Sequence, residues 1–287
     1  MAQVNWKRVP QPTLAPEKRT RSFDEVNQNY TLEQVLAEAN RCLQCGNPAC
    51  EMGCPAGNPI RDYIGLLREG KFMEAVRLDR TSNPLMPCTG RVCAWEEQCE
   101  GACVLGLKGD PINIGAIERW LGDYAQAHPE LEDYNVPPRN GFKVAIIGAG
   151  PAGLTAAHYL VWKGYEVTIF EAWHLPGGVM AYGIPEYVLP QRVIDAEFER
   201  LQKYGVRLIT NVRVGRDLTV DDLFARGYDA VFIGIGANQA RKMGIPGEDL
   251  QAVYTAKDFL LLAAEHVLRE QHPEIPAPEP LLVGERV

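Results

Sequence analysis

The stretch that decides the fold is Val144-Ala145-Ile146-Ile147-Gly148-Ala149-Gly150-Pro151-Ala152-Gly153. Apolar, mostly β-branched residues are followed directly by the pattern Gly-x-Gly-x-x-Gly. This order predicts a strand, a tight turn at Gly148 and a helix from Gly153, with Gly150 allowing the backbone to approach a pyrophosphate. The first N–H groups of the helix have no partner within it and attract phosphate. The stretch therefore predicts a dinucleotide site, and by itself it leaves FAD and NAD(P) both open.

The residues after this stretch repeat a strand–helix pattern. The predicted strands are 143–147, 166–170, 206–211 and 230–235, and the predicted helices are 153–163 and 193–204. Alternating strands and helices indicate a parallel sheet with helices on its faces. Glu171 ends the second strand, where an acid can accept hydrogen bonds from a ribose. This context favours a nucleotide site over the alternative, a glycine turn in an ordinary strand–helix unit.

The first half of the chain has a helical pattern instead. Residues 1–30 are polar and contain prolines, which predicts an extended arm, and Thr31-Leu32-Glu33-Gln34 is a capping box that opens a helix through about Arg41. Further helices are predicted over 59–69, 71–78 and 114–127. Prolines and glycines between residues 128 and 141 indicate a domain boundary. We therefore expect an α/β protein with an all-helical domain at 1–140 and a Rossmann-like domain at 141–287.

Composition restricts the class of protein. A chain of 287 residues suggests about two domains, and 46% hydrophobic with 23% charged residues is ordinary for a globular protein. The net charge of −8 gives no electrostatic footprint for nucleic acid. The apolar stretch 144–162 contains glycines and a proline, and residues 1–8 lack the apolar segment of a secretory signal. We expect a cytoplasmic protein that binds neither nucleic acid nor a membrane.

All eight cysteines lie in one part of the chain. They form the series Cys42-x2-Cys45-x4-Cys50-x3-Cys54-Pro55 and Cys88-x4-Cys93-x5-Cys99-x3-Cys103. A tight run closed by Cys-Pro is typical of bacterial ferredoxins, in which the fourth cysteine binds the other cluster. Zinc sites with four cysteines usually supply two Cys-x2-Cys pairs, and only one pair occurs here. The spacing therefore favours iron–sulfur clusters, with zinc, disulfides or unliganded thiols as the alternatives.

Short motifs along nearly the whole chain carry a family resemblance. In the first half they are Cys42-Leu43-Gln44-Cys45, Gly53-Cys54-Pro55, Thr89-Gly90-Arg91-Val92-Cys93, Gln98-Cys99-Glu100-Gly101-Ala102-Cys103 and Pro111-Ile112-Asn113-Ile114-Gly115. In the second half they are the glycine pattern, Gly177-Gly178, Tyr182-Gly183-Ile184-Pro185 and Ile245-Pro246-Gly247-Glu248. Together they resemble the small (beta) subunit of glutamate synthase and its relatives. These relatives include the FAD subunit of bifurcating NADH-dependent ferredoxin:NADP oxidoreductase and the N-terminal half of dihydropyrimidine dehydrogenase.

The resemblance implies two 4Fe-4S clusters with interleaved ligands. One cluster is then held by Cys42, Cys45, Cys50 and Cys103. The other is held by Cys54, Cys93, Cys99 and an acid on the helix after the Pro-x-x-Ile-Gly motif, here Glu118. The alternative for Glu118 is a solvated acid on the surface of that helix. Cys88 is left over, either as a semi-buried thiol or as a ligand in place of Glu118.

The resemblance also assigns the glycine pattern to FAD. The residues that it implies for the pyrophosphate and ribose are Gly148, Gly150, Pro151, Ala152, Gly153 and Glu171. Those implied near the isoalloxazine are Gly177, Gly178, Tyr182, Gly183, Ile184 and Pro185. For this second set the alternative is that the residues only shape an ordinary loop and bind no ligand. No catalytic side chain is assigned.

Relatives continue with a second glycine pattern for NAD(P)H, and no such pattern follows Gly153 in this chain. We therefore expect the front part of a longer enzyme. The resemblance implies that NAD(P)H gives a hydride to FAD in the intact enzyme, and that the clusters pass single electrons to a partner. That partner is a larger catalytic subunit of the glutamate synthase type or a ferredoxin-linked subunit. The alternatives are an inactive fragment, an iron–sulfur relay without flavin, and a zinc-containing interaction module.

Overall fold

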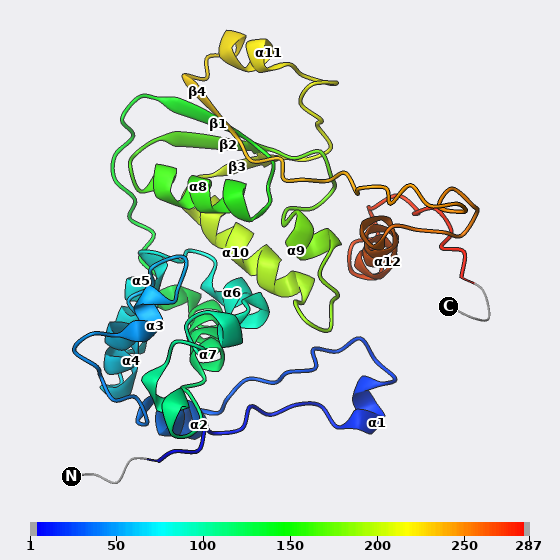
Figure 1. Cartoon of the computed structure of the whole chain (residues 1–287). Coiled ribbons are helices and arrows are strands. Elements are labelled where there is room, and N and C mark those ends of the chain that lie inside the picture. The colour runs from blue at the N-terminus through cyan, green and yellow to red at the C-terminus, as the bar shows by residue number, and fades with distance from the viewer. Residues whose placement is uncertain (1–4, 284–287) are drawn as a thin grey trace. The chain divides into compact units, whose positions relative to one another are not determined.

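The computed structural model describes residues 5–283, so the ends of both predicted domains (1–4 and 284–287) lie outside the described residues. The chain divides into two compact units, Met1–Tyr134 and Asn135–Val287 (Figure 1). The predicted boundary at residues 140 and 141 lies in the polar segment that follows Tyr134. Among the helices of residues 5–283, none is both long enough and apolar enough to cross a membrane.

The first unit consists of helices and loops. Its α-helices are α1 (Pro16–Arg19), α2 (Leu32–Ala39), α3 (Ala49–Met52), α4 (Ile60–Arg68), α5 (Phe72–Arg80), α6 (Met86–Val92) and α7 (Ile114–Ala127). Three 3-10 helices are η1 (Trp95–Glu97), η2 (Val104–Leu107) and η3 (Pro129–Leu131). The predicted capping box of α2 is confirmed, because the Thr31 side chain accepts from the Gln34 N–H and the Gln34 side chain accepts from the Thr31 N–H.

The core of the first unit lies between α2, α4, α5, α6 and α7. Its fully buried side chains include Tyr63, Leu67, Ile117 and Leu121. Two glycines let α6 and α7 approach closely. A Cβ on Gly90 of α6 would lie 2.5 Å from the Arg119 backbone nitrogen, and one on Gly122 of α7 would lie 2.6 Å from the Pro87 Cα. This packing explains why α6 forms in a segment that the sequence analysis treated only as a run of cysteines.

The predicted arm is a hairpin with a helix at its tip. Thr13 and Asn27 form an isolated antiparallel bridge, and the Leu14 N–H donates to the Val26 carbonyl. Helix α1 follows in the bend of the arm (Figure 1). The arm is therefore held by backbone hydrogen bonds across its two sides, which polar composition alone did not reveal.

The second unit is built on a four-stranded parallel sheet in the order β3-β2-β1-β4. The strands are β1 (Lys143–Ile147), β2 (Glu166–Phe170), β3 (Arg207–Ile209) and β4 (Ala230–Ile233). The helices are α8 (Pro151–Val161), α9 (Val179–Tyr182), α10 (Gln191–Lys203), α11 (Val220–Ala225) and α12 (Ala256–Gln271). Helix α8 packs on β1 and β2 and α10 packs on α8, while α11 packs against β4 (Figure 1). The predicted α/β fold, a helical domain followed by a Rossmann-like sheet, is confirmed.

Helix α8 begins at Pro151, two residues before the predicted start at Gly153. A proline fits the first helical turn, because its missing N–H would have no partner there. The strand order places β1 and its turn at the centre of the sheet. In sheets of this kind ligands bind beyond the carboxyl ends of the central strands. The fold therefore puts the glycine pattern where a nucleotide site belongs.

Candidate functional site

Four cysteines of the helical unit surround one pocket. Cys42, Cys45, Cys50 and Cys103 all line it, although Cys103 is far from the others in sequence. Burial raises the pKa of the Cys50 thiol to about 12, and the neighbouring Cys103 and Cys42 raise it further. Such thiols stay protonated unless a cation compensates their charge, and bound metal supplies that charge. This group of four is called the first cysteine group below.

The remaining predicted cysteine ligands and Glu118 act on one another electrostatically. These cysteines are Cys54, Cys93 and Cys99. Burial raises the pKa of Cys93 to about 12, and the next causes are the charges of Glu118 and Cys54. Burial also raises the pKa of the Cys99 thiol, and the charge of Glu118 is the next largest cause. Cys54, Cys93, Cys99 and Glu118 therefore form a second cysteine group. The first group lines one pocket as a set, and the assignment of both groups as cluster ligands stays a prediction.

Glu118 is buried on α7, with 5% of its surface exposed. Its Oε1 accepts hydrogen bonds from Asn83 Nδ2 at 2.9 Å and from the Thr89 hydroxyl. Burial raises the pKa of Glu118 to about 7, while these two hydrogen bonds lower it. The alternative of a solvated surface acid is wrong. A buried carboxylate within electrostatic range of the Cys93 and Cys99 thiols offers the kinds of donor found in a mixed cysteine–carboxylate metal site.

Several buried polar atoms near the second cysteine group have no hydrogen-bond partner in the described structure. These are the Tyr63 hydroxyl, both carboxylate oxygens of Asp79, and Nε1 of Trp95. Tyr63 and Asp79 both lie within electrostatic range of Glu118. Trp95 lies between Cys93 and Cys99 in sequence. Unsatisfied buried groups are costly, so this region fits a bound polar or charged group.

Within residues 5–283, no three Cys, His, Asp or Glu side chains come close enough together to hold one metal ion. In a four-iron cluster each thiolate binds a different iron, so the sulfurs stand around the cluster. The eight cysteines, all among the described residues, form no disulfide. Cys88 is buried within α6, with 1% of its surface exposed.

The glycine pattern opens onto a cleft of about 1320 Å³ in the second unit. This volume exceeds the roughly 300–1,000 Å³ of pockets for drug-sized ligands, so it has room for a dinucleotide. The ends of three strands, Ile147, Phe170 and Ile233, line the cleft. Of the predicted nucleotide residues, those that line it are Gly148, Gly150, Pro151, Ala152, Glu171 and Gly178.

Hydrogen bonds hold the glycine turn in shape. The Glu171 carboxylate accepts from the Ala149 N–H at 2.7 Å and from the Trp173 N–H at 2.9 Å. The Gly177 N–H donates to the Ala149 carbonyl at 2.8 Å. Glu171 therefore braces the turn, a role that the sequence analysis did not foresee. Each carboxylate oxygen keeps a further lone pair that can accept from a ribose hydroxyl.

Two glycines of the pattern differ in what requires them. The packing of the protein requires Gly153, whereas the approach of a ligand would require Gly150. A Cβ on Gly153 would collide with the Gly148 carbonyl oxygen, so Gly153 permits the close packing of α8 on the turn. A Cβ on Gly150 would meet only the Gly178 Cα at 3.8 Å, and its φ of −76° suits any residue. The protein itself therefore does not need a glycine at 150. The space left there fits a group that approaches the backbone from the cleft.

Comparison with known proteins identifies both units. Residues 19–130 match the family model for dihydropyrimidine dehydrogenase domain II, 4Fe-4S cluster, and residues 142–272 match pyridine nucleotide-disulphide oxidoreductase. The chain is 37% identical to the glutamate synthase [NADPH] small chain of Escherichia coli over 92% of its own length and 56% of that relative. It is 37% identical to the small chain of Halomonas elongata over 95% of its length and 58% of that relative.

The chain is a homologue of the glutamate synthase small chains. It spans a little more than half the length of these relatives. The matched part holds the residues similar to the 4Fe-4S model and to the pyridine nucleotide-disulphide oxidoreductase model, and the predicted likeness to glutamate synthase small chains is confirmed. A match also extends to the glutamate synthase [NADH] of Schizosaccharomyces pombe, at 35% identity over 90% of this chain and 12% of that much longer protein.

Other predicted residues of this small-chain homologue lie beside the cleft rather than in its lining. The Tyr182 hydroxyl accepts from the Leu175 N–H at 3.1 Å, and its ring contacts Trp173 with a centroid distance of 4.4 Å. Burial raises the pKa of Tyr182 to about 12. The residues that the structure does not place in the lining are Gly153, Gly177, Tyr182, Gly183, Ile184 and Pro185. Their proposed contact with a flavin ring stays a prediction.

Two basic residues of the cleft were missed by the sequence analysis. Arg213 follows β3, and Lys257 lies in the first turn of α12. Both line the cleft together with the glycine turn. Neither belongs to a recognisable motif. Each reaches the cleft only through the folding of segments that are distant in sequence, so the sequence alone did not indicate them. They add positive charge to a cleft that contains a buried carboxylate, Glu171.

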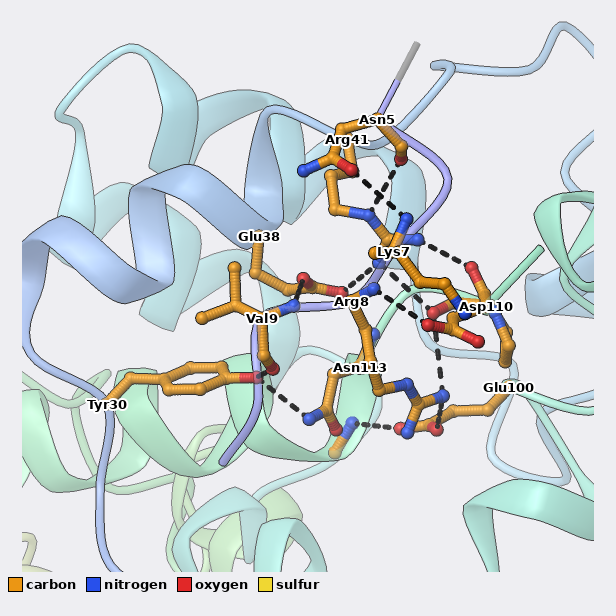
Figure 2. A network of polar contacts seen from close by, with 12 residues as sticks. Asn5, Lys7, Arg8, Val9, Tyr30, Glu38, Arg41, Glu100, Asp110 and Asn113 are labelled. Carbon is orange, nitrogen blue, oxygen red and sulfur yellow. Dashed lines mark hydrogen bonds and ion pairs between the residues drawn. The ribbon is translucent and has the colours of Figure 1, made fainter. Parts of the chain in front are cut away.

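A polar network attaches residues 5–9 to Glu38, Glu100 and Asp110 of the helical unit (Figure 2). Arg8 pairs with the Glu100 carboxylate at 3.0 Å, and the other oxygen of Glu100 accepts from the Gly115 N–H at 3.0 Å. The Val9 N–H donates to buried Glu38 at 2.7 Å. Glu100 therefore satisfies an N–H in the first turn of α7, the helix that carries Glu118. It also directly follows Cys99 in the chain.

Replacing Arg8 with alanine should destabilise the helical unit. Glu100 has only 3% of its side chain exposed and would lose its charged partner. Hydrogen bonds to charged groups contribute on the order of 2 kcal/mol, so we expect a fall of about that size in the free energy of unfolding. Chemical denaturation measures it. The control is Arg77→Ala, which removes an exposed side chain from the same unit and should cost less than about 0.5 kcal/mol. Equal losses in the two variants would contradict a structural role for the network.

Proposed function

We propose that this chain is the FAD- and cluster-carrying part of an NAD(P)H-dependent electron-transfer oxidoreductase of the glutamate synthase small-subunit type. One observation supports this more than any other. Seven cysteines and one buried glutamate fall into two groups of four in the helical unit, although their order along the chain is interleaved. FAD bound here would take up a hydride as two electrons and could release them one at a time, and each cluster would carry one electron, so the two kinds of site together would convert a hydride into single electrons.

We assign the ligands according to these two groups. Cys42, Cys45, Cys50 and Cys103 hold the first cluster. The second is held by Cys54, Cys93, Cys99 and Glu118. In both places the protein buries thiols whose pKa is raised without metal, so metal binding must release their protons. Asn83 and Thr89 orient the Glu118 carboxylate by donating to Oε1, which leaves Oε2 for the metal.

In the second unit, we propose that the residues of the glycine turn bind the pyrophosphate, the ribose and the isoalloxazine of FAD. The first N–H groups of α8 bind the pyrophosphate, which the open space at Gly150 allows to approach. Glu171 braces the turn and accepts from the ribose. We propose that Gly177, Gly178 and the turn from Tyr182 to Pro185 bound the space for the isoalloxazine. The hydroxyl of Tyr182 is already bonded to the Leu175 N–H, so it contributes its ring rather than a free donor.

The proposed partner is a larger subunit of the glutamate synthase type, and the proposed compartment is the cytoplasm. The Schizosaccharomyces pombe protein supports this choice of partner, because there the region similar to this chain is 12% of one long polypeptide named glutamate synthase [NADH]. A second candidate is an electron-transfer subunit of a dihydropyrimidine dehydrogenase-type or ferredoxin-linked enzyme. It is supported by the name of the family model that matches residues 19–130.

The Glu118→Ala variant tests the assignment of the second cluster. In anaerobic protein reduced with dithionite, wild-type chain should give two cluster signals in electron paramagnetic resonance. We expect the variant to change or lose one signal and to keep the other, because only the second cysteine group contains Glu118. Glu97→Ala, an exposed acid of the same region, is the matched control and should leave both signals intact. Two unchanged signals in Glu118→Ala would reject Glu118 as a ligand.

A further inference from the structure

Gln44 has an unusual backbone conformation beside the first cysteine group. It lies between Cys42 and Cys45, and its φ is +52°. Among the described residues only Asn211 and Ala252 are other non-glycine residues with positive φ. The left-handed conformation is unfavourable for a residue with a Cβ, which crowds the following carbonyl oxygen. Contacts made by Gln44 must therefore hold it there.

The side chain of Gln44 makes those contacts. Its Nε2 donates to Cys42 Sγ at 3.3 Å and to the Arg61 carbonyl at 3.0 Å. The Arg61 carbonyl can only accept, so the nitrogen of the amide must face this side. The Gln44 backbone N–H is also bonded to Cys42. Both donors of Gln44 thus converge on one sulfur.

Helix α4 is shaped to receive the Gln44 amide. Gly65 lies inside this helix, where glycine costs about 1 kcal/mol relative to alanine. A Cβ on Gly65 would lie 3.1 Å from Gln44 Oε1, which is closer than an ordinary contact. The glycine therefore leaves room for the amide oxygen. With Arg61 on the same helix, α4 fixes the amide on two sides and directs its N–H toward the sulfur.

We propose that Gln44 is a positioning residue that sets the reduction potential of the first cluster through its N–H···S hydrogen bond to Cys42. This rests on the proposed function, since Cys42 must be a cluster ligand. A hydrogen bond to a ligating sulfur withdraws negative charge from the cluster, and it is one of the factors that set cluster potentials. Reduction adds one negative charge, so the bond stabilises the reduced form. Its loss makes the potential more negative.

The test is a potentiometric titration of full-length chain with detection by electron paramagnetic resonance. Gln44→Met keeps the length of the side chain and removes its donors, and Gln44→Glu also adds negative charge. We expect the midpoint potential of the first cluster to become more negative in Gln44→Met and more negative still in Gln44→Glu. The second cluster, identified by its response to Glu118→Ala, should keep its midpoint. The matched control Gln98→Met should leave the first cluster unchanged, and an unshifted first midpoint in both Gln44 variants would overturn the proposal.

A second measurement needs no variant. Wild-type chain with glutamine labelled by ¹⁵N at the side-chain amide should show, in pulsed electron paramagnetic resonance, a ¹⁵N and an exchangeable proton coupled to the reduced first cluster. No such coupling would overturn the role of Gln44 even if the variants failed to assemble clusters. Failure of the proposed function is distinct, because wild-type chain would then show no reducible cluster signal at all.

Discussion

The Cys103→Ala variant is expected to lose one whole cluster and to keep the other. Cys103 is only four positions beyond Cys99, yet it lines the pocket of Cys42, Cys45 and Cys50. A cubane that lacks one of its thiolates is exposed to loss of iron, whereas Cys99 and its partners keep all their ligands. Iron and acid-labile sulfide in anaerobically purified protein should therefore fall to about half of the wild-type content. One of the two signals in electron paramagnetic resonance should disappear.

The control for this experiment is Cys88→Ala. Cys88 is a buried cysteine of α6 that lies in neither group of ligands, so its removal should leave iron content and both signals unchanged. Cys45→Ala should reproduce the loss of the same signal that Cys103→Ala removes, and Cys99→Ala should remove the other one. Loss of the same signal in Cys99→Ala and Cys103→Ala would contradict the interleaved assignment.

The Gly150→Val variant is expected to lose bound FAD without unfolding. The valine side chain would project into space that only the Gly178 Cα borders, at 3.8 Å from the new Cβ, and φ at this position suits a β-branched residue. It would occupy the path by which a pyrophosphate reaches the N–H groups of α8. We expect flavin affinity to fall by at least about 100-fold, which corresponds to about 2.8 kcal/mol.

Flavin released by heating and measured by fluorescence checks this result. The clusters of the same protein serve as the internal control, because the substitution lies in the second unit and iron content should not change. The melting temperature should stay within a few degrees of wild type, since the Gly178 Cα, at 3.8 Å, is the only atom that the new Cβ meets. Full FAD occupancy in Gly150→Val would contradict the position of the pyrophosphate at this turn.

Local patterns predicted much of the fold. The capping box at Thr31, the helix over 114–127 and the strands 143–147 and 166–170 follow from side chains that interact with near neighbours or alternate with a clear period. The strand predicted over 230–235 is shorter, and β4 ends at Ile233. Helix α12 was not identified at all. Its apolar residues at 259–264 are consecutive, and a short continuous apolar run does not separate a helix from a strand by its period.

The candidate site depended more on tertiary contacts. Spacing favoured iron–sulfur ligands and the resemblance already grouped Cys103 with Cys42, Cys45 and Cys50, but only the fold shows that these four line one pocket and that Glu118 is buried. The roles of Gln44 and Arg8 could not be predicted, because each depends on a partner brought close by folding: Arg61 for Gln44, and Glu100 for Arg8. The left-handed backbone at Gln44 leaves no mark in sequence, since glutamine is not a residue that indicates positive φ.

The cofactor content of the chain, purified without oxygen, tests the central claim most directly. If the chain holds two four-iron clusters and one flavin, it should contain about eight iron atoms, about eight acid-labile sulfides and about one FAD. The purified protein should be brown, and dithionite should bleach its colour. Iron, sulfide and released flavin are each measured on the same sample. A colourless protein with stoichiometric zinc and no flavin would contradict the account, and it would favour a zinc-containing interaction module instead.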